Sequence, residues 1–496
     1  MGGVDLESYR EGAEEFVAEL SREHYLHLAG HKPELEVEAI YDRHSELFEA
    51  DVVEALREAM DKADGEEARR RRYLLHFAFD GLVGARTRSE QEELAGLEAS
   101  LAVEVDGESI GYRQVAVELA NEPSGERRAA LADARDEVLD EKLNPIHLRA
   151  FETTRAACAE MGWSGPTEAY SALRALDLAG LAEQTDRFLR ATEGRYASVV
   201  DPQLARAGVP ALGRVRRTDL PRFFRAPHLD DEFEPERMVP SLEETLAGLD
   251  VDLAAQSNVT LDAEPRPTKS PRAFCSTPRV PEEIYLVVAP VGGPGDFEAL
   301  FHEAGHTEHY ANVDPAFAFE YRHLGDNAVT ESFAFLFESL TAEPAWLADR
   351  LGATGEEASA QARAVKLVFV RRYAAKLAYE LELGGAAPDL GAMPLRYKEL
   401  LGGATRVEWP AVSWLDDVDE GFYVACYLRA WALETHWRRA LSERFGERWW
   451  RSAEAGAWLR DLWSEGQRLN AEELLAQTLG EELDFGLLAA ELGGGG

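Results

Sequence analysis

Apolar residues recur every three to four positions along most of this chain, which is the spacing of amphipathic helices. Residues 5–200 read as a series of such helices, interrupted by Gly, Pro and charged turns, and residues 440–492 return to the same pattern with many Trp. Two stretches differ. Val103–Ile110 alternates around an Asp-Gly pair and predicts a small hairpin, and Glu283–Pro290 is β-branched and aromatic and predicts a strand. The pattern therefore predicts a mainly α protein with a small β element.

The pattern changes to a Pro- and Arg-rich irregular stretch between residues 201 and 240. A chain of 496 residues is long enough for two or three domains. We therefore expect an N-terminal helical region at 1–200 and a second region at 201–496. In the first region, the basic cluster Arg69–Arg72 is flanked by acidic residues and predicts a solvated helix face.

The candidate chemistry lies in Asp296–His309, which contains His302, Glu303 and His306 in the order H-E-x-x-H. On a helix the two histidines lie roughly 40° apart, close enough for both imidazoles to bind one ion. Glu303 lies about 100° from His302, where it is placed to take a proton from a water bound to the metal. The motif predicts a zinc site with Glu303 as the general base.

A catalytic zinc needs a third protein ligand, and the next helical stretch, Asp326–Glu338, offers Glu331. Burying a carboxylate is costly unless a cation meets it. The neighbours of Glu331 are almost all apolar: Val329, Phe333, Ala334, Phe335 and Phe337. Glu338 falls within about 20° of the same helical face, so it either accepts the second N–H of a ligand histidine or is a solvated glutamate near the helix end.

These residues carry a family resemblance. His302–His309 resembles the H-E-x-G-H-x-x-H signature of the thimet oligopeptidase and oligoendopeptidase F family of zinc peptidases, and Thr330–Glu338 resembles that family's second metal helix. The resemblance implies a large helical, gluzincin-like zinc peptidase with a deep cleft or channel and a small β element beside the zinc helix. It covers roughly residues 215–440, so the region at 201–496 would be the catalytic one. In the family the third histidine of the motif is not a ligand, so we expect His309 to support a ligand or to be structural.

A second resemblance concerns Phe422–Tyr427, which is similar to the F-Y-V-Y-x-Y segment of oligoendopeptidases. In that family the tyrosines donate hydrogen bonds to the oxyanion, which implies this role for Tyr423 and Tyr427. Four residues apart on a helix, the two side chains share a face. The chain departs from the family at Ala425, which replaces a tyrosine, and in Val407–Gly421, which lacks the usual histidine. That stretch carries three aspartates instead, Asp416, Asp417 and Asp419.

Two segments beside the motif bear on substrate. The strand at Ile284–Ala289 precedes the zinc helix and could pair through its free edge with an extended peptide. The aromatic loop Asn312–Gly325 follows the helix, and it either closes over the site or belongs to the core.

Composition limits the class of partner. The net charge is −40, from 92 acidic and 52 basic residues, and such a charge repels nucleic acid and anionic membrane surfaces. No apolar run approaches 18 residues, no secretory signal is visible at the N-terminus, and three scattered cysteines favour a reducing compartment. We therefore expect a soluble, cytoplasmic protein, a monomer or homodimer, that binds neither nucleic acid nor membrane.

These observations predict a hydrolase: a metalloendopeptidase that cleaves oligopeptides with one Zn²⁺ per chain, bound by His302, His306 and Glu331. Two alternatives remain open. One is a zinc carboxypeptidase of related helical fold, and the other is a zinc-binding homologue that has lost turnover, which the absent histidine near Asp417 would explain.

Overall fold

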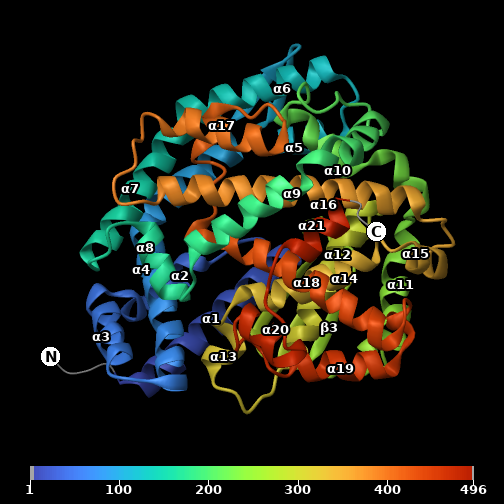
Figure 1. Cartoon of the computed structure of the whole chain (residues 1–496). Coiled ribbons are helices and arrows are strands. Elements are labelled where there is room, and N and C mark those ends of the chain that lie inside the picture. The colour runs from blue at the N-terminus through green and yellow to red at the C-terminus, as the bar shows by residue number, and fades with distance from the viewer. Residues whose placement is uncertain (1–4, 494–496) are drawn as a thin grey trace. The chain divides into compact units, whose positions relative to one another are not determined.

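The computed structural model describes residues 5–493 and is about 70% helix and 5% strand, which confirms a mainly α protein (Figure 1). The contacts divide the chain into two compact units, and each unit is assembled from three separate segments. The first comprises Met1–Phe79, Leu229–Ser359 and Arg429–Leu487, and the second comprises Asp80–His228, Ala360–Leu428 and Leu488–Gly496. The chain passes between the units at five points, and one of them, at residues 228 and 229, falls within the irregular Pro- and Arg-rich stretch.

The first unit contains the H-E-x-x-H motif. Its elements are α1 (Leu6–Leu28), α2 (Val37–Arg43), α3 (Ala50–Asp61), α11 (Pro235–Gly248), β3 (Val259–Asp262), β4 (Phe274–Arg279), β5 (Glu283–Val287), α12 (Pro294–Ala311), α13 (Phe319–His323), α14 (Asn327–Leu340), α15 (Pro344–Arg350), α19 (Ala453–Trp463) and α20 (Ala471–Leu479).

The second unit contains the predicted hairpin. Its elements are β1 (Ala102–Val105), β2 (Glu108–Gly111), α5 (Val115–Asn121), α6 (Gly125–Val138), α7 (Asn144–Glu160), α8 (Pro166–Arg174), α9 (Leu178–Arg206), α10 (Leu220–Arg225) and α17 (Met393–Thr405). Four helices begin in one unit and end in the other: α4 (Gly65–Ser100), α16 (Glu356–Leu383), α18 (Tyr423–Phe445) and α21 (Gly486–Leu492).

The hairpin forms as predicted, with β1 antiparallel to β2. Asp106 and Gly107 both have positive φ, 54° and 83°, which the tight two-residue turn requires. The apolar side of the hairpin packs on α5 and α6, where Val103 and Ile110 join a core that includes Leu131.

The strand predicted before α12 forms, but the prediction that it has a free edge is wrong. The strand order is β3-β5-β4, with β3 parallel and β4 antiparallel to β5. The predicted strand is β5, and it lies in the centre of the sheet, where both of its edges are already paired. Its Ile284, Leu286 and Val287 are at most 1% exposed. A peptide could therefore add only to an outer strand, β3 or β4.

Asp296 holds the start of α12. The cap position is Gly293, with φ of 87°, and Pro294 follows in the first turn. Asp296 accepts hydrogen bonds from the backbone N–H groups of Val291 and Gly292, at 3.2 and 3.1 Å. It thereby fixes the turn that leads into α12.

The Arg69–Arg72 cluster was predicted to be a solvated helix face. It instead joins α4 to other elements of the first unit. Arg69 binds Glu473 of α20 with two nitrogens, at 2.9 and 2.7 Å. Arg71 donates to the Ala59 carbonyl of α3 at 2.6 Å. The partners lie up to 404 residues away in the chain, so the local acidic flanks gave no sign of them.

The aromatic loop after α12 belongs to the core, which was one of its two predicted roles. Phe319 and Tyr321 of α13 are buried, and Glu320 is 0% exposed, with its carboxylate 2.6 Å from Arg10 Nε. The Tyr321 carbonyl accepts a hydrogen bond from Gln467 N at 2.8 Å.

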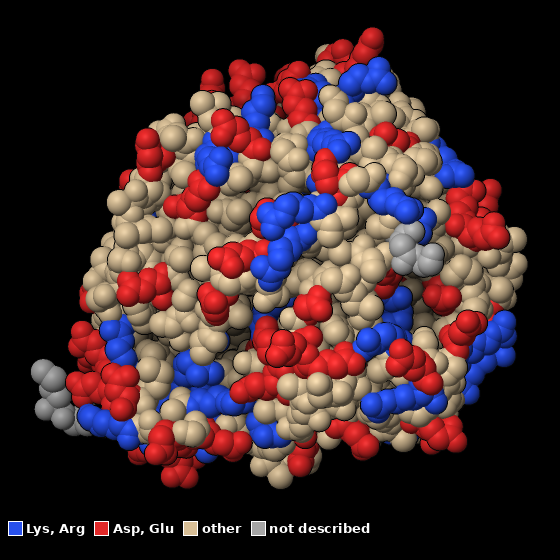
Figure 2. Space-filling model, in the orientation of Figure 1, with Lys and Arg blue, Asp and Glu red and all other residues tan. Residues whose placement is uncertain are grey.

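None of the helices in residues 5–493 combines the length and the apolar composition that a membrane span requires. Figure 2 shows Asp and Glu side chains over much of the visible face, with Lys and Arg between them.

Candidate metal centre

The structure brings the three predicted ligands together in the first unit. His302 and His306 lie one turn apart on α12, and Glu331 reaches them from α14, where it is 5% exposed. Glu331 Oε2 lies 3.4 Å from His302 Nε2 and 3.7 Å from His306 Nε2, and the three donor atoms all lie within 4.8 Å of one another. Ligands at about 2.0–2.2 Å around a tetrahedral zinc are separated by about 3.4 Å, so these residues fit the ion.

The other ring nitrogen of each histidine has its own acceptor on α14. His302 Nδ1 lies 2.8 Å from Glu338 Oε2, and His306 Nδ1 lies 2.8 Å from Thr330 Oγ1. Acceptors at Nδ1 hold a proton there and leave Nε2 as the ring atom directed at the centre. Of the two predicted roles for Glu338, the acceptor role is the one found. Thr330 was not predicted, although its position directly before Glu331 was a signal that could have identified it.

The two histidines experience different electrostatic surroundings. Burial disfavours the imidazolium of His302, but the neighbouring carboxylates of Glu331 and Glu338 outweigh it, so the pKa of His302 is raised well above its ordinary value. Burial dominates at His306 and lowers its pKa to about 4. His306 is therefore neutral near pH 7, as a ligand must be, whereas His302 must lose a proton when a metal binds.

Glu303 is close to the ligands but directed elsewhere. Its Oε2 accepts a hydrogen bond of 2.8 Å from the backbone N–H of Cys275 in β4. Because that N–H is used by Glu303, it points away from β5 and toward the outer edge of the sheet. Burial raises the pKa of Glu303 to about 7, which suits a group that must both accept and release a proton near neutral pH.

The α12 and α14 backbones are in direct contact at Gly305. A Cβ at this position would lie 2.4 Å from the Phe333 carbonyl oxygen and 2.6 Å from the Ala334 Cα. Glycine is therefore needed here for close approach rather than for an unusual φ. The approach lets the short Thr330 and Glu331 side chains reach across to the histidines.

Aromatic rings border the ligands on one side. The Phe335 ring meets the His302 ring edge-on at 5.1 Å and stacks on Trp431 of α18, also at 5.1 Å. Such packing restricts the rotation of His302 and lowers the local dielectric, which strengthens charge interactions at the centre.

His309 has a structural role in the described structure. It is 0% exposed, its Nε2 lies 3.3 Å from the Gly466 carbonyl, and burial lowers its pKa to about 3. It lies outside the ligand group, which agrees with the expectation from the resemblance.

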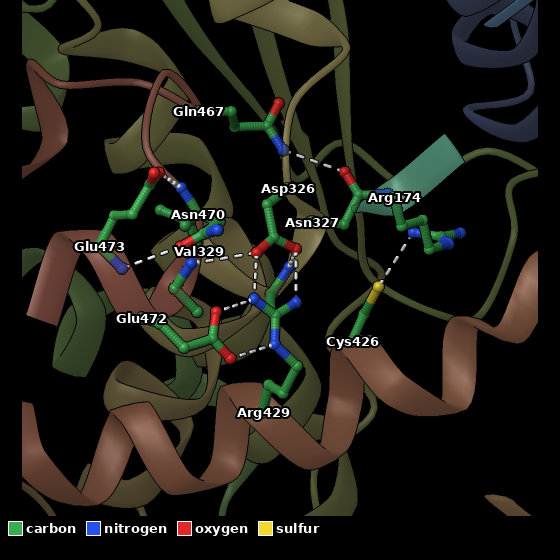
Figure 3. Close-up of polar contacts among 12 residues, drawn as sticks. Arg174, Asp326, Asn327, Val329, Cys426, Arg429, Gln467, Asn470, Glu472 and Glu473 are labelled. Atoms are coloured by element: carbon green, nitrogen blue, oxygen red, sulfur yellow. Dashed lines mark hydrogen bonds and ion pairs between the residues drawn. The ribbon is translucent and has the colours of Figure 1, made fainter. Parts of the chain in front are cut away.

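Tyr423 and Tyr427 form the first turn of α18 and belong to the second unit, whereas the ligands belong to the first. Their rings are 4.9 Å apart, so they share a helical face as predicted. The turn before them is unusual, because Gly421 and Phe422 both have positive φ, 59° and 58°. Arg174 holds this turn by donating to the Gly421 carbonyl at 2.8 Å. It also donates to Cys426 Sγ at 3.3 Å (Figure 3).

The aspartates that stand where the family has a histidine make ion pairs within the second unit. Asp417 pairs with Arg372 and accepts a hydrogen bond of 2.6 Å from the Tyr397 hydroxyl. Asp419 Oδ1 lies 2.6 Å from Lys376 Nζ. Their partners are cations and a hydroxyl, so these aspartates stabilise the turn before α18.

No family model matches the chain, and no curated protein matches it significantly. The resemblance to the oligopeptidase family therefore stays a prediction, supported by the motifs in α12, α14 and α18.

Proposed function

We propose that the protein is a zinc metallopeptidase that hydrolyses oligopeptides. The observation that carries the proposal is the convergence of His302 Nε2, His306 Nε2 and Glu331 Oε2 within 4.8 Å, beside a glutamate whose pKa is about 7. Two neutral imidazoles and a carboxylate form the ligand set of catalytic zinc in peptidases, with one position open for water or substrate.

The residues divide the reaction between them. Zinc held by His302, His306 and Glu331 would supply a Lewis acid, which makes water more acidic and polarises a carbonyl. Glu303 takes the proton from the attacking water and passes it to the leaving amine. Thr330 and Glu338 keep the histidines in the tautomer that presents Nε2. By the resemblance, the Tyr423 and Tyr427 hydroxyls donate hydrogen bonds to the oxyanion.

The sheet supports a peptide as the substrate. β4 is an outer strand, and its Cys275 N–H is directed outward to Glu303, so this edge of the sheet lies next to the proposed base. An extended peptide that pairs with β4 would bring its own backbone to Glu303 through hydrogen bonds that read length and shape. A folded substrate would have to order an extended segment at about 1–2 kcal/mol per residue, so short peptides are favoured.

The test is incubation of the zinc-loaded protein with a mixed peptide library, followed by identification of the cut sites by mass spectrometry. Internal cuts in short peptides support the proposal, successive removal of C-terminal residues favours the carboxypeptidase, and no cleavage with any metal or salt condition refutes peptidase activity.

A matched pair of variants identifies the base. Glu303→Gln should keep zinc and lose turnover, because only the proton acceptor is removed. Glu308→Gln is the control, since Glu308 lies on the same helix, has a pKa also raised to about 7 by burial, and faces Gln256 and Asn312 instead. Turnover retained in Glu303→Gln as fully as in Glu308→Gln would exclude Glu303 as the base.

A further inference from the structure

A buried arginine of α18 joins that helix to α20 and to the N-terminal end of α14 (Figure 3). Arg429 of α18 has a side chain only 4% exposed. Its guanidinium binds both carboxylate oxygens of Asp326, at 3.0 and 2.7 Å, and its Nε lies 2.7 Å from Glu472 Oε1 on α20. Two carboxylates thus share one guanidinium in planar, two-pronged geometry, which lysine cannot reproduce.

Asp326 is also the residue that caps α14. Its Oδ1 accepts from the Ala328 N–H at 3.1 Å, and its Oδ2 accepts from the Ala471 N–H at 3.0 Å, where α20 begins. Burial would raise the pKa of Asp326, but Arg429 and these backbone donors outweigh it and keep the pKa below its ordinary value. The carboxylate therefore stays charged and accepts four hydrogen bonds.

α14, which Asp326 caps, also carries the residues that the two histidines contact. Glu331 lies five residues after Asp326, about 7.5 Å along the axis, and Thr330 and Glu338 share the helix. A side-chain oxygen about 5–6 Å from the helix axis moves by about 1 Å when the helix rotates by 10°. Metal bonds tolerate only about 0.2 Å, so the rotation of α14 must be fixed tightly.

Gly305 fixes how closely α14 approaches α12, and the contacts of Thr330 and Glu338 with the two histidines join the same pair of helices. Asp326 adds a fixed point at the N-terminal end of α14, outside the contact with α12. Gln467, which is 0% exposed, adds a hydrogen bond of 3.0 Å to the Asn327 side chain at the same end (Figure 3).

We propose that Arg429 is a positioning residue for the metal centre: acting through Asp326, it sets the rotation of α14 and so the place of Glu331 against the two histidines. The inference rests on the proposed zinc function and adds a residue whose hydrogen bonds go to Asp326 and Glu472.

Two substitutions test the role without removing the helix cap. Arg429→Lys keeps the charge and loses the two-pronged contact. Asp326→Asn keeps a good capping side chain and loses the ion pair. The control is Arg128→Lys in the second unit, because Arg128 is 1% exposed and binds Asp219 of the same unit through Nε and Nη2, at 3.0 and 2.7 Å.

The readouts are zinc affinity by chelator competition, the visible absorption spectrum of the cobalt-substituted protein, and urea unfolding. We expect Arg429→Lys and Asp326→Asn each to lower zinc affinity about 10–100-fold and to change the cobalt spectrum. Arg128→Lys should lose comparable stability and leave both metal readouts unchanged.

Zinc affinity and cobalt spectra that match the wild type in Arg429→Lys and Asp326→Asn would overturn the inference and leave the peptidase proposal standing. If one variant does not fold, the other decides. Wild-type protein that binds zinc with these expected effects but cleaves no peptide would refute the peptidase and leave the positioning role intact, whereas failure of the wild type to bind any metal would overturn both.

Discussion

Replacing Gly305 by alanine should disable the metal centre while leaving the fold largely intact. The new methyl group would lie 2.4 Å from the Phe333 carbonyl oxygen and 2.6 Å from the Ala334 Cα, whereas ordinary contacts begin at 3.4 Å. Both obstacles are backbone atoms of α14, so no side-chain rotation relieves the clash. The helix itself must retreat from α12 by about 1 Å.

The cost falls unequally on stability and on metal binding. Overpacking costs about 1–3 kcal/mol, and the better helix propensity of alanine returns up to about 1 kcal/mol, so the net loss of unfolding free energy is about 0–3 kcal/mol. Glu331 moves with α14, and its distances of 3.4 and 3.7 Å to the histidine nitrogens grow by about 1 Å, several times what zinc tolerates. We expect zinc affinity to fall at least about 100-fold.

The assay pairs zinc affinity with urea unfolding and uses Gly295→Ala as the control. Gly295 lies on the same helix, and nothing lies within 4 Å of the Cβ that alanine would add. Gly295→Ala should bind zinc normally and gain no more than about 1 kcal/mol. Normal zinc affinity in Gly305→Ala would show that the contact between the two helices does not set the ligand geometry.

Four further predictions follow from the same centre. Thr330→Val should lower zinc affinity about 10–100-fold, because it removes the acceptor of a ligand histidine. Thr307→Val, which loses a hydroxyl bonded to a backbone carbonyl on α12, should leave the affinity unchanged. Equal zinc affinities in the two variants would contradict this. Glu331→Ala should weaken zinc far more than Glu338→Ala, and the reverse ranking would mean that the ligand is misassigned. Because the pKa of His302 is raised, the protein without metal holds a proton there near neutral pH, and zinc must displace it. Zinc affinity should therefore fall about tenfold for each pH unit below that pKa, and calorimetry in several buffers should detect about one proton released. With a net charge of −40, the melting temperature should rise as NaCl increases from 0.1 to 1 M, because the screening length shortens from about 10 to about 3 Å; a fall would count against self-repulsion.

The residues of the metal centre were predictable where the signal is local. His302, Glu303 and His306 lie within one and a half helical turns, so the geometry of a single helix fixes their relation. Glu331 was predictable for a different reason, since a carboxylate in an apolar helix needs a cation or a donor. In both cases the physics acts within one element.

The features that escaped prediction depend on contacts between distant segments. β5 was recognised as a strand, but its central place depends on β3, which has only four residues, and on β4, which contains Pro278 and a register irregularity. Neither neighbour has a clear strand pattern. Arg429 and Asp326 are 103 residues apart, and nothing near either one indicates the other.

The chemistry of the centre is decided by the register between α12 and α14 more than by the motif itself. Glu338 meets His302 and Thr330 meets His306, so later residues of α14 face earlier residues of α12, and the helices run antiparallel. Glu331 and Glu338 lie on nearly the same face, two turns or about 10.5 Å apart, so a slide of α14 could exchange the ligand glutamate for the supporting one. Gly305 resists that slide in the middle of the contact, and the hydrogen bonds of Asp326 resist it at the helix end. An H-E-x-x-H helix in a chain without such fixed points would keep two histidines in place but would have no defined third ligand.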